Sequence, residues 1–219
     1  MYLLAIRGTL RAPALEDSRA LHNQTAGNPE AVAAAKALGD LSHMVYVPVA
    51  RSTSGPNEFL ILDVWNSLEG LNKFFSNHQV QEQAGRIFTT REPLVWTPAE
   101  GLTTYHLPVP YGKNERVVAL ARGTVESHDG AKAPHNKIVG GGLNTARKAG
   151  SISHEAYFRL NPQSENESKE ILAVDLWMDA QGMNQFLADP EVRLGFQGLF
   201  TSPPSISAWI HPPGDWVEW

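Results

Sequence analysis

Residues 59–75 read FLILDVWNSLEGLNKFF, and residues 171–187 read ILAVDLWMDAQGMNQFL. Each stretch begins with an apolar, β-prone run that leads to an aspartate, one apolar residue and a tryptophan. Each then continues with the spaced apolar residues of an amphipathic helix. The same strand-to-helix pattern therefore occurs twice, which indicates two copies of one folding unit.

The similarity extends outward from these stretches. Residues 3–98 align with residues 118–212 at an offset that stays between 111 and 115, through the paired strings LLAIRGTL and VVALARGTV, LHN and PHN, AKALGDLSHMVY and ARKAGSISHEAY, and IFTT and LFTS. Residues 100–115 are rich in proline, glycine and polar residues, as linkers are. We therefore predict domains at 1–99 and 116–219, with 100–115 as the linker. The aromatic end HPPGDWVEW is expected to pack on the domain or on a partner chain.

Both copies predict the same order of elements. In the first copy we expect strands at 2–10, 42–50, 59–65 and 94–98, a hairpin connection at 51–57, and helices from Asn28-Pro29 to Gly39 and from Ser67 to Ile87. In the second copy Gly140–Gly142 is expected to split the first helix or to delay it to Leu143. The order βαββαβ is that of the α+β ferredoxin-like module. Two such sheets would bury their open faces by packing together as a closed α+β barrel.

Composition excludes several classes of function. The chain of 219 residues has no cysteine, so it forms no disulfide, thiolate zinc site or iron–sulfur cluster. A formal charge of -5 without a basic run argues against nucleic acid as a partner. No apolar run is long enough for a membrane span, and the first residues lack the features of a signal peptide. We therefore expect a cytoplasmic protein that binds small molecules.

A longer pattern resembles a known family. It consists of G-x-x-S-H-x-x-Y, a hairpin, a strand that ends in acidic-x-Trp, and a helix that begins S-x-E-x-L. In the first copy it spans Gly39 to Leu71, and the second copy departs from it at Asp179 and Gln181. This pattern resembles the antibiotic biosynthesis monooxygenase superfamily of dimeric α+β barrels. The resemblance implies the barrel fold, but the reaction is left open because the superfamily includes quinol and polyketide monooxygenases, haem-degrading enzymes and proteins without known activity.

Polar and aromatic residues that both copies retain are the candidate site residues. The candidate catalytic residues are His22, Asn23, His43 and Trp65 with His135, Asn136, His154 and Trp177, and the candidate substrate-binding residues are Arg7, Asp63 and Tyr46 with Arg122, Asp175 and Tyr157. Alternation along 59–65 puts Asp63 and Trp65 on one face, which we expect to point away from the helices. Arg7 would then reach Asp63, either as a structural ion pair or as an anchor for a polar group of the substrate.

The proposed chemistry is cofactor-independent oxygenation of an aromatic, quinol-like or polyketide-like molecule by dioxygen. A histidine would remove the hydroxyl proton, because the phenolate is the form that can reduce oxygen. Asn23 would stabilise the developing anion and Trp65 would contact the ring, a set that the resemblance also implies for oxygenase members. Alternatively, Asn23 caps a helix that starts near His22-Asn23.

Other functions stay open at this point. A two-histidine, one-carboxylate iron site at His22, His43 and Asp63 is less favoured, as is haem bound through His78. The chain could instead be a non-catalytic small-molecule or haem-binding protein, or a stress-associated structural module. Pairing of the fused barrel into a homodimer is a further expectation.

Overall fold

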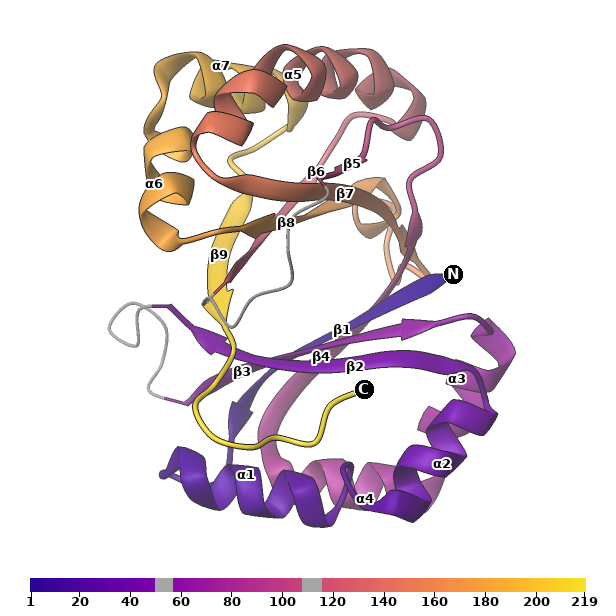
Figure 1. Ribbon diagram of the computed structural model, residues 1–219. Helices are drawn as coiled ribbons and strands as arrows, with labels where there is room; N and C mark the ends of the chain where they lie inside the picture. Colours follow the sequence, from indigo (N-terminus) through magenta and orange to yellow (C-terminus); the bar gives the residue numbers. More distant parts are fainter. Residues whose placement is uncertain (50–56, 108–115) are drawn as a thin grey trace. The chain divides into compact units, whose positions relative to one another are not determined.

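The computed structural model describes residues 1–49, 57–107 and 116–219 (Figure 1). The chain divides into two compact units, the first made of residues 1–95 and 211–219 and the second of residues 96–210. Most of the predicted hairpin connection at 51–57, and residues 108–115 of the predicted linker, lie outside the described residues.

The first unit is a four-stranded sheet with helices on one face (Figure 1). The strand order is β4-β1-β3-β2, and β3 is antiparallel to both β1 and β2. This is the predicted ferredoxin-like arrangement. The elements are β1 (Tyr2–Leu10), α1 (Leu15–Gln24), α2 (Pro29–Ala37), β2 (Asp40–Pro48), β3 (Glu58–Trp65), α3 (Leu68–Phe75), α4 (His78–Ile87) and β4 (Phe88–Pro98), whose last residues belong to the second unit.

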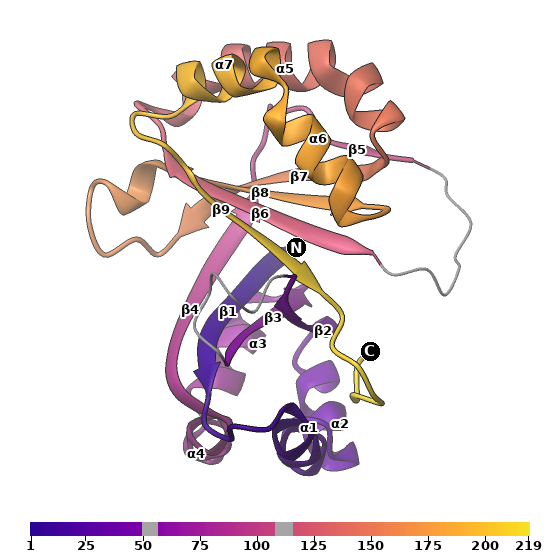
Figure 2. The same cartoon turned by 90° about the vertical axis from the view of Figure 1, so that its left-hand side faces the viewer.

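The second unit repeats this arrangement and adds a short edge strand (Figure 2). Its strand order is β9-β6-β8-β7-β5. The elements are β5 (Tyr105–His106), β6 (Val117–Thr124), α5 (His128–Lys148), β7 (Ser151–Leu160), the short 3₁₀ helix η1 (Glu167–Lys169), β8 (Glu170–Trp177), α6 (Ala180–Ala188), α7 (Pro190–Leu199) and β9 (Ser205–Ile210). Among the described residues, no helix combines the length and the apolar character that crossing a bilayer requires.

Side-chain caps mark the starts of most helices; one helix was not predicted, and two predictions about helices were wrong. Helix α1 was not predicted at all, and its start is not marked by a capping side chain. The single helix expected over 67–87 is two helices, because Asn77 accepts a hydrogen bond from the backbone of Gln79 and starts α4. Helix α5 continues through Gly140–Gly142, since packing against α7 stabilises a helix that propensity alone would weaken.

The prediction about the faces of β3 was reversed. His43, Asp63 and Trp65 lie on the face that the helices cover, where Trp65 packs against Phe74 and Phe75 of α3. Alternation had grouped these residues correctly, but both faces of β3 are equally buried: Leu60 on the opposite face is 1% exposed, and Ile61 on the helix-covered face is 5% exposed. Hydrophobicity therefore gave no indication of which face meets the helices.

The division into units also differs from the predicted domain boundaries at two segments. Residues 96–107, placed partly in the predicted linker, belong to the second unit, while residues 211–219 belong to the first. The latter segment runs beside α1 and α2: Val217 lies next to Gly27, and Lys36 lies over the ring of Trp219 (Figure 1). Each unit therefore contains a segment from the end of the other copy: residues 96–107 lie in the second unit, and residues 211–219 lie in the first. We call these two segments the trailing segments.

Candidate functional site

Three polar side chains form a buried chain of hydrogen bonds in the first unit. His22 Nε2 lies 2.9 Å from His43 Nε2, and His43 Nδ1 lies 2.7 Å from Asp63 Oδ1. His22 is fully buried, His43 is 5% exposed and Asp63 is 3% exposed. His43 and Asp63 are direct cross-strand neighbours, and the end of α1 supplies His22. We call His22, His43 and Asp63 the first histidine–aspartate array.

The second unit contains the same arrangement. His135 Nε2 lies 3.1 Å from His154 Nε2, and His154 Nδ1 lies 2.7 Å from Asp175 Oδ1. His135 comes from the middle of α5, while His154 and Asp175 are cross-strand neighbours on β7 and β8. We call these three residues the second histidine–aspartate array. The structure thus brings together the six predicted histidine and aspartate residues as two triplets.

An asparagine next to the outer histidine fixes where the protons lie. Asn23 Nδ2 donates to the carbonyl of Asp215, and its Oδ1 accepts from the backbone N–H of Val217. Its Oδ1, 3.1 Å from His22 Nδ1, is therefore an acceptor for that nitrogen, so His22 carries its proton on Nδ1. His22 Nε2 is then an acceptor, and His43 must donate to it as well as to Asp63. The pattern is a neutral His22 beside a protonated His43.

The electrostatics favour the same pattern. Burial, and then the charge of His43, lower the pKa of His22 to about 4 despite the hydrogen bond that His22 donates to Asn23. Burial also opposes the charge on His43, but the charge and hydrogen bond of Asp63, together with the charges of Asp40 and Glu218, outweigh it and raise the pKa of His43. In the second unit Asn136 makes equivalent bonds to Gly101 and Thr103, and burial lowers the pKa of His135.

Each trailing segment places an aromatic ring over the inner histidine. The ring of Trp219 stacks on His43 at 4.6 Å, and two backbone hydrogen bonds join these residues. In the second unit Tyr105 of β5 stacks on His154 at 5.9 Å and pairs with it in the sheet. The two rings cover corresponding positions. Sequence reasoning expected the end of the chain only to pack on a domain or partner, and nothing in its composition showed that Trp219 contacts a histidine.

A cavity lies between the sheet and the helices in each unit. His43, Asp63 and Trp219 line the first together with apolar side chains of α2, α3 and α4, and Gln83 and Arg91 add further polar groups. The second is lined by His135, His154, Asp175, Tyr105, Trp177 and otherwise apolar side chains. The volumes are about 80 Å³ and about 60 Å³. Each cavity is thus mainly apolar, with a histidine–aspartate array in its wall.

Asp40, which no sequence pattern singled out, also lines the first cavity. A bulge at Leu41 makes two residues of β2 oppose one residue of β3, so that Asp40 shares the face of His43 although they are three residues apart. Burial, and then the charge of Asp63, raise the pKa of Asp40 to about 7, while His43 opposes this rise. The indole of Trp219 is close enough to favour the ionised carboxylate but forms no hydrogen bond of good geometry. The residue was missed because its counterpart is Ser151, so retention in both copies excluded it.

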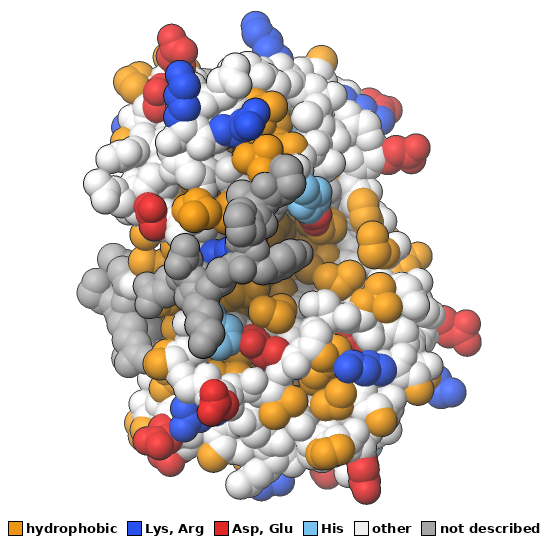
Figure 3. Space-filling view, in the orientation of Figure 1, with side chains coloured by type: hydrophobic (Ala, Val, Ile, Leu, Met, Phe, Trp, Pro, Cys, Tyr) orange, Lys and Arg blue, Asp and Glu red, His pale blue; other side chains and the backbone are white. Residues whose placement is uncertain are grey.

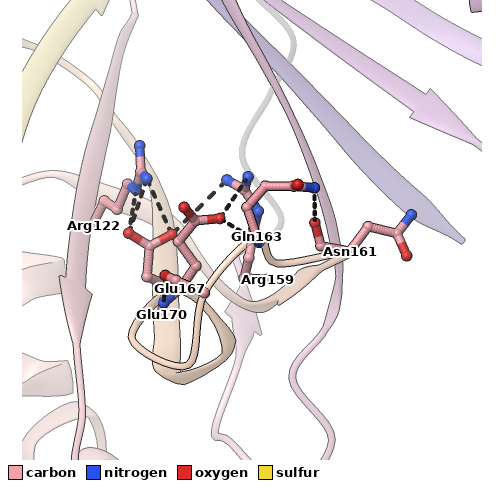
Figure 4. A network of polar contacts seen from close by, with 7 residues as sticks. Arg122, Arg159, Asn161, Gln163, Glu167 and Glu170 are labelled. Atoms are coloured by element: carbon pink, nitrogen blue, oxygen red, sulfur yellow. Dashed lines mark hydrogen bonds and ion pairs between the residues drawn. The ribbon is translucent and has the colours of Figure 1, made fainter.

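The predicted substrate-binding arginines do not reach the arrays. Arg7 pairs with Glu58 at 2.9 Å, not with Asp63, because its position in β1 is opposite Leu60 and on the other face of the sheet. Arg122 likewise pairs with Glu170 in a polar network with Arg159 and Glu167 (Figure 4).

The predicted tyrosines are also outside the cavities. Tyr46 and Tyr157 are on the face opposite His43 and His154, since each is an odd number of residues further along a regular strand. Trp177 lines the second cavity, whereas its counterpart Trp65 is fully buried against α3. The site residues thus divide into a group at the cavities and a group on the other sheet face.

Three alternative roles are not supported by the geometry. Asn23 lies at the end of α1 and accepts from Val217, so the helix-capping role was wrong, and Asn28 is the residue that caps the next helix. The described residues include no group of three or more His, Cys, Asp or Glu side chains arranged to hold a metal ion. His78, the predicted haem ligand, is exposed and forms a pair with Glu82.

Surface charge gives no sign of a polyanion site on the face shown in Figure 3, where basic and acidic side chains alternate over the described surface.

No protein-family model matches the sequence, and a search of curated proteins gives no match.

Solved structures show which fold the chain shares. An anthrone oxidase-like protein is 14% identical with a TM-score of 0.66, covering 97% of this chain and 91% of that one. A presumed monooxygenase from Lactobacillus acidophilus NCFM is 11% identical with a TM-score of 0.60, covering 97% of both chains. An uncharacterized ferredoxin fold protein from Listeria monocytogenes 4b F2365, related to antibiotic biosynthesis monooxygenases, is 10% identical with a TM-score of 0.51, covering 98% and 96%. The chain therefore has the fold of the ferredoxin-fold proteins related to antibiotic biosynthesis monooxygenases, as its sequence resemblance implied.

Proposed function

We propose that the protein is an oxygenase that binds a small hydroxylated aromatic molecule in its cavities and oxidises it with dioxygen. The observation that carries the proposal is the buried histidine–aspartate array, of which His43 and Asp63 line a mainly apolar cavity. Burying two histidines and a carboxylate is costly, and a fold does not need them for packing. Perturbed titratable groups in a cavity are typical of active sites.

The chemistry of the lining suits such a substrate. Apolar side chains such as Ile61 and Phe74 would contact the faces of an aromatic ring, and the polar wall would receive its hydroxyl group. The protonated His43 would stabilise the anion that forms when the hydroxyl loses its proton, because a nearby cation favours the charged form. The resulting electron-rich ring is the species that transfers electrons to oxygen.

The overall reaction needs no external reductant. An activated ring carbon that bears two hydrogens can be converted to a carbonyl by one molecule of dioxygen. A carbon–oxygen bond forms, two carbon–hydrogen bonds and the oxygen–oxygen bond break, and the second oxygen atom leaves as water. The carbon loses four electrons and dioxygen gains four, so substrate and oxygen balance each other.

The size of the cavity sets a condition on binding. An engineered apolar cavity of roughly 150 Å³ holds one benzene molecule, and the first cavity is about 80 Å³. A substrate with a ring therefore has to displace a side chain. Trp219 is the best placed, because its ring already stacks on His43 as a bound aromatic molecule would. We accordingly expect residues 215–219 to move when substrate binds.

Oxygen uptake tests the proposal. Purified protein is supplied with a panel of hydroxylated anthrones, naphthols and quinols, and the product is analysed for one atom of ¹⁸O from ¹⁸O₂. We expect uptake by the wild type and a loss of at least about 100-fold in the double variant His43→Gln/His154→Gln. The matched control His78→Gln changes an exposed histidine and should keep full activity. Folded wild-type protein that binds these rings but takes up no oxygen would instead be a non-catalytic aromatic-binding protein.

A further inference from the structure

We infer that Asp40 is the general base that removes the hydroxyl proton from the bound ring, so that turnover takes place in the first unit and not in the second. This inference rests on the proposed function and adds to it the residue and the unit that perform the proton transfer. The position of Asp40, the bonds of the neighbouring histidines and the residue at the matching position of the second unit each support it.

The backbone directs the Asp40 carboxyl into the cavity. Asp40 opposes Trp65, two residues from Asp63, and the bulge that follows it aligns its side chain with His43. Bulges commonly re-aim a side chain next to an active site. Asp40 is 4% exposed, so its carboxyl is covered by protein and lines the cavity together with Asp63 and Trp219. A ring that replaced the Trp219 side chain would lie against this carboxyl.

The histidines are less able to accept the substrate proton. Both ring nitrogens of His43 are occupied, one by Asp63 and the other by His22. The nitrogens of His22 are occupied by His43 and Asn23, and His22 is not among the residues that line the first cavity. Asp40 differs, because the hydrogen bond found for its side chain is a long one of 3.3 Å, from Ser42 N to Oδ1. A general base needs an unoccupied lone pair within reach of the proton.

The surroundings of Asp40 bring its pKa close to neutral pH. Burial disfavours the ionised form of Asp40 most strongly, and the charge of Asp63 on β3 adds to this effect. His43 on β2 favours the ionised form, and Arg91 on β4 lines the same cavity. The net result is the pKa of about 7 described above, where ionised and protonated forms are both populated near neutral pH. A base with such a pKa is well matched to its task, because it can take up a proton and release it again.

The second unit lacks this group. Its bulge lies at the same place, between Ser151 and Ser153, and gives Ser151 the position of Asp40. A serine hydroxyl does not accept a proton near neutral pH, and that of Ser151 is hydrogen-bonded to Tyr105 at 2.7 Å. The second unit therefore retains an array and a cavity but has no carboxyl at this position.

The proton transfer itself is balanced. The ionised Asp40 takes the hydroxyl proton, the oxygen–hydrogen bond of the substrate breaks, and its electron pair stays on the ring oxygen. Asp40 becomes a neutral carboxylic acid, and the new anion lies near the protonated His43. Water produced in the reaction, or solvent, returns Asp40 to its ionised form.

Two measurements test this assignment on the full chain, with Asp40→Asn as the variant. Oxygen uptake at different pH values should rise to a plateau as Asp40 ionises in the wild type. In Asp40→Asn it should fall at least about 100-fold and lose that step. The loss should be nearly complete, not half, because the second unit contributes no turnover. Uptake by Asp40→Asn that stays within about threefold of the wild-type rate, which includes a loss of one half, overturns the inference.

The second measurement does not depend on turnover. Binding of 2-naphthol, measured by calorimetry, should tighten as pH rises through the ionisation of Asp40, because its hydroxyl then donates to a carboxylate. The step should be absent in Asp40→Asn and with 2-methoxynaphthalene, which has no proton to donate. If the step is seen without oxygen uptake, the oxygenase proposal fails and Asp40 stays the proton acceptor. If 2-methoxynaphthalene shows the same step, or Asp40→Asn keeps it, the assignment of Asp40 fails.

Discussion

The two units share their polar arrays but differ at the cavity wall that faces them. In the first unit Asp40, Gln83 and Arg91 add charged and polar groups to the wall, whereas corresponding groups are not among the residues that line the second cavity. The covering ring is Trp219 in one unit and Tyr105 in the other. The arrays are thus the common framework, and the wall residues are where the functions of the two sites would diverge. The following predictions address that division.

The largest effect is expected when a histidine of an array is removed. His43→Ala leaves Asp63 buried without its partner, which should destabilise the first unit by about 3–5 kcal/mol. His154→Ala should cost less in the second unit, because the side chain of Asp175 is 20% exposed and that of Asp63 is 5% exposed. Amide hydrogen exchange in β3 and in β8 measures the stability of the first and the second unit separately. Equal losses of stability in the two variants would show that the two arrays are equally shielded from water.

The second prediction concerns the stability cost of Asp40. Its pKa is about 7 in the folded protein and 3.8 in the reference state, so the folded state binds the extra proton between these values. The free energy of unfolding should therefore fall as pH rises from about 4 to 7, and it should stay low above pH 7. The total decrease is up to about 4 kcal/mol, since each pKa unit corresponds to about 1.36 kcal/mol.

Asp40→Asn should remove this dependence and make the first unit more stable than wild type at pH 8. The two proteins should be nearly equal at pH 4. Denaturant unfolding at both pH values checks this, with Ser151→Ala as the matched change in the second unit. A variant less stable than wild type at pH 8 would contradict the prediction.

A smaller effect is expected from the asparagines that hold the trailing segments. Asn23→Ala removes the bonds to Asp215 and Val217 and should weaken attachment of residues 215–219 by about 1–2 kcal/mol. Asn136→Ala should have the same effect on residues 101–103. Limited proteolysis detects the released segment, and Asn28→Ala, which removes a helix cap, serves as the control because it should leave the segment attached.

The smallest effect is expected at Lys36, whose ammonium group lies 5.6 Å from the centre of the Trp219 ring. Lys36→Met keeps the aliphatic stem and removes the charge, so it should loosen the segment by less than about 1 kcal/mol. The difference should shrink at high salt. An effect larger than that of Asn23→Ala would mean that charge, and not the asparagine, holds Trp219 over His43.

The sequence was sufficient to predict the two ferredoxin-like units and to mark His22, His43 and Asp63 as candidate site residues, although it grouped these three only as a less favoured iron site and paired Asp63 with Arg7. Duplication made this possible, because retained polar residues are conspicuous when their neighbours change. The orientation of β3 could not be predicted, since apolar residues occupy both of its faces. The role of Asp40 depends on a bulge one residue wide, which leaves no periodic signal. Trp219 could not be assigned because it meets His43 across most of the length of the chain.

The exchange of trailing segments has a consequence for how the chain folds. Asn23 and Val217 are 194 positions apart in sequence, so the first unit cannot attach the segment that covers its array until residue 217 has been synthesised. Contacts of such long range are formed late and slowly. The first site would thus mature later in synthesis than the second unit, which receives residues 96–107 from earlier in the chain. A chain cut between the repeats would give two halves that each carry the segment the other requires.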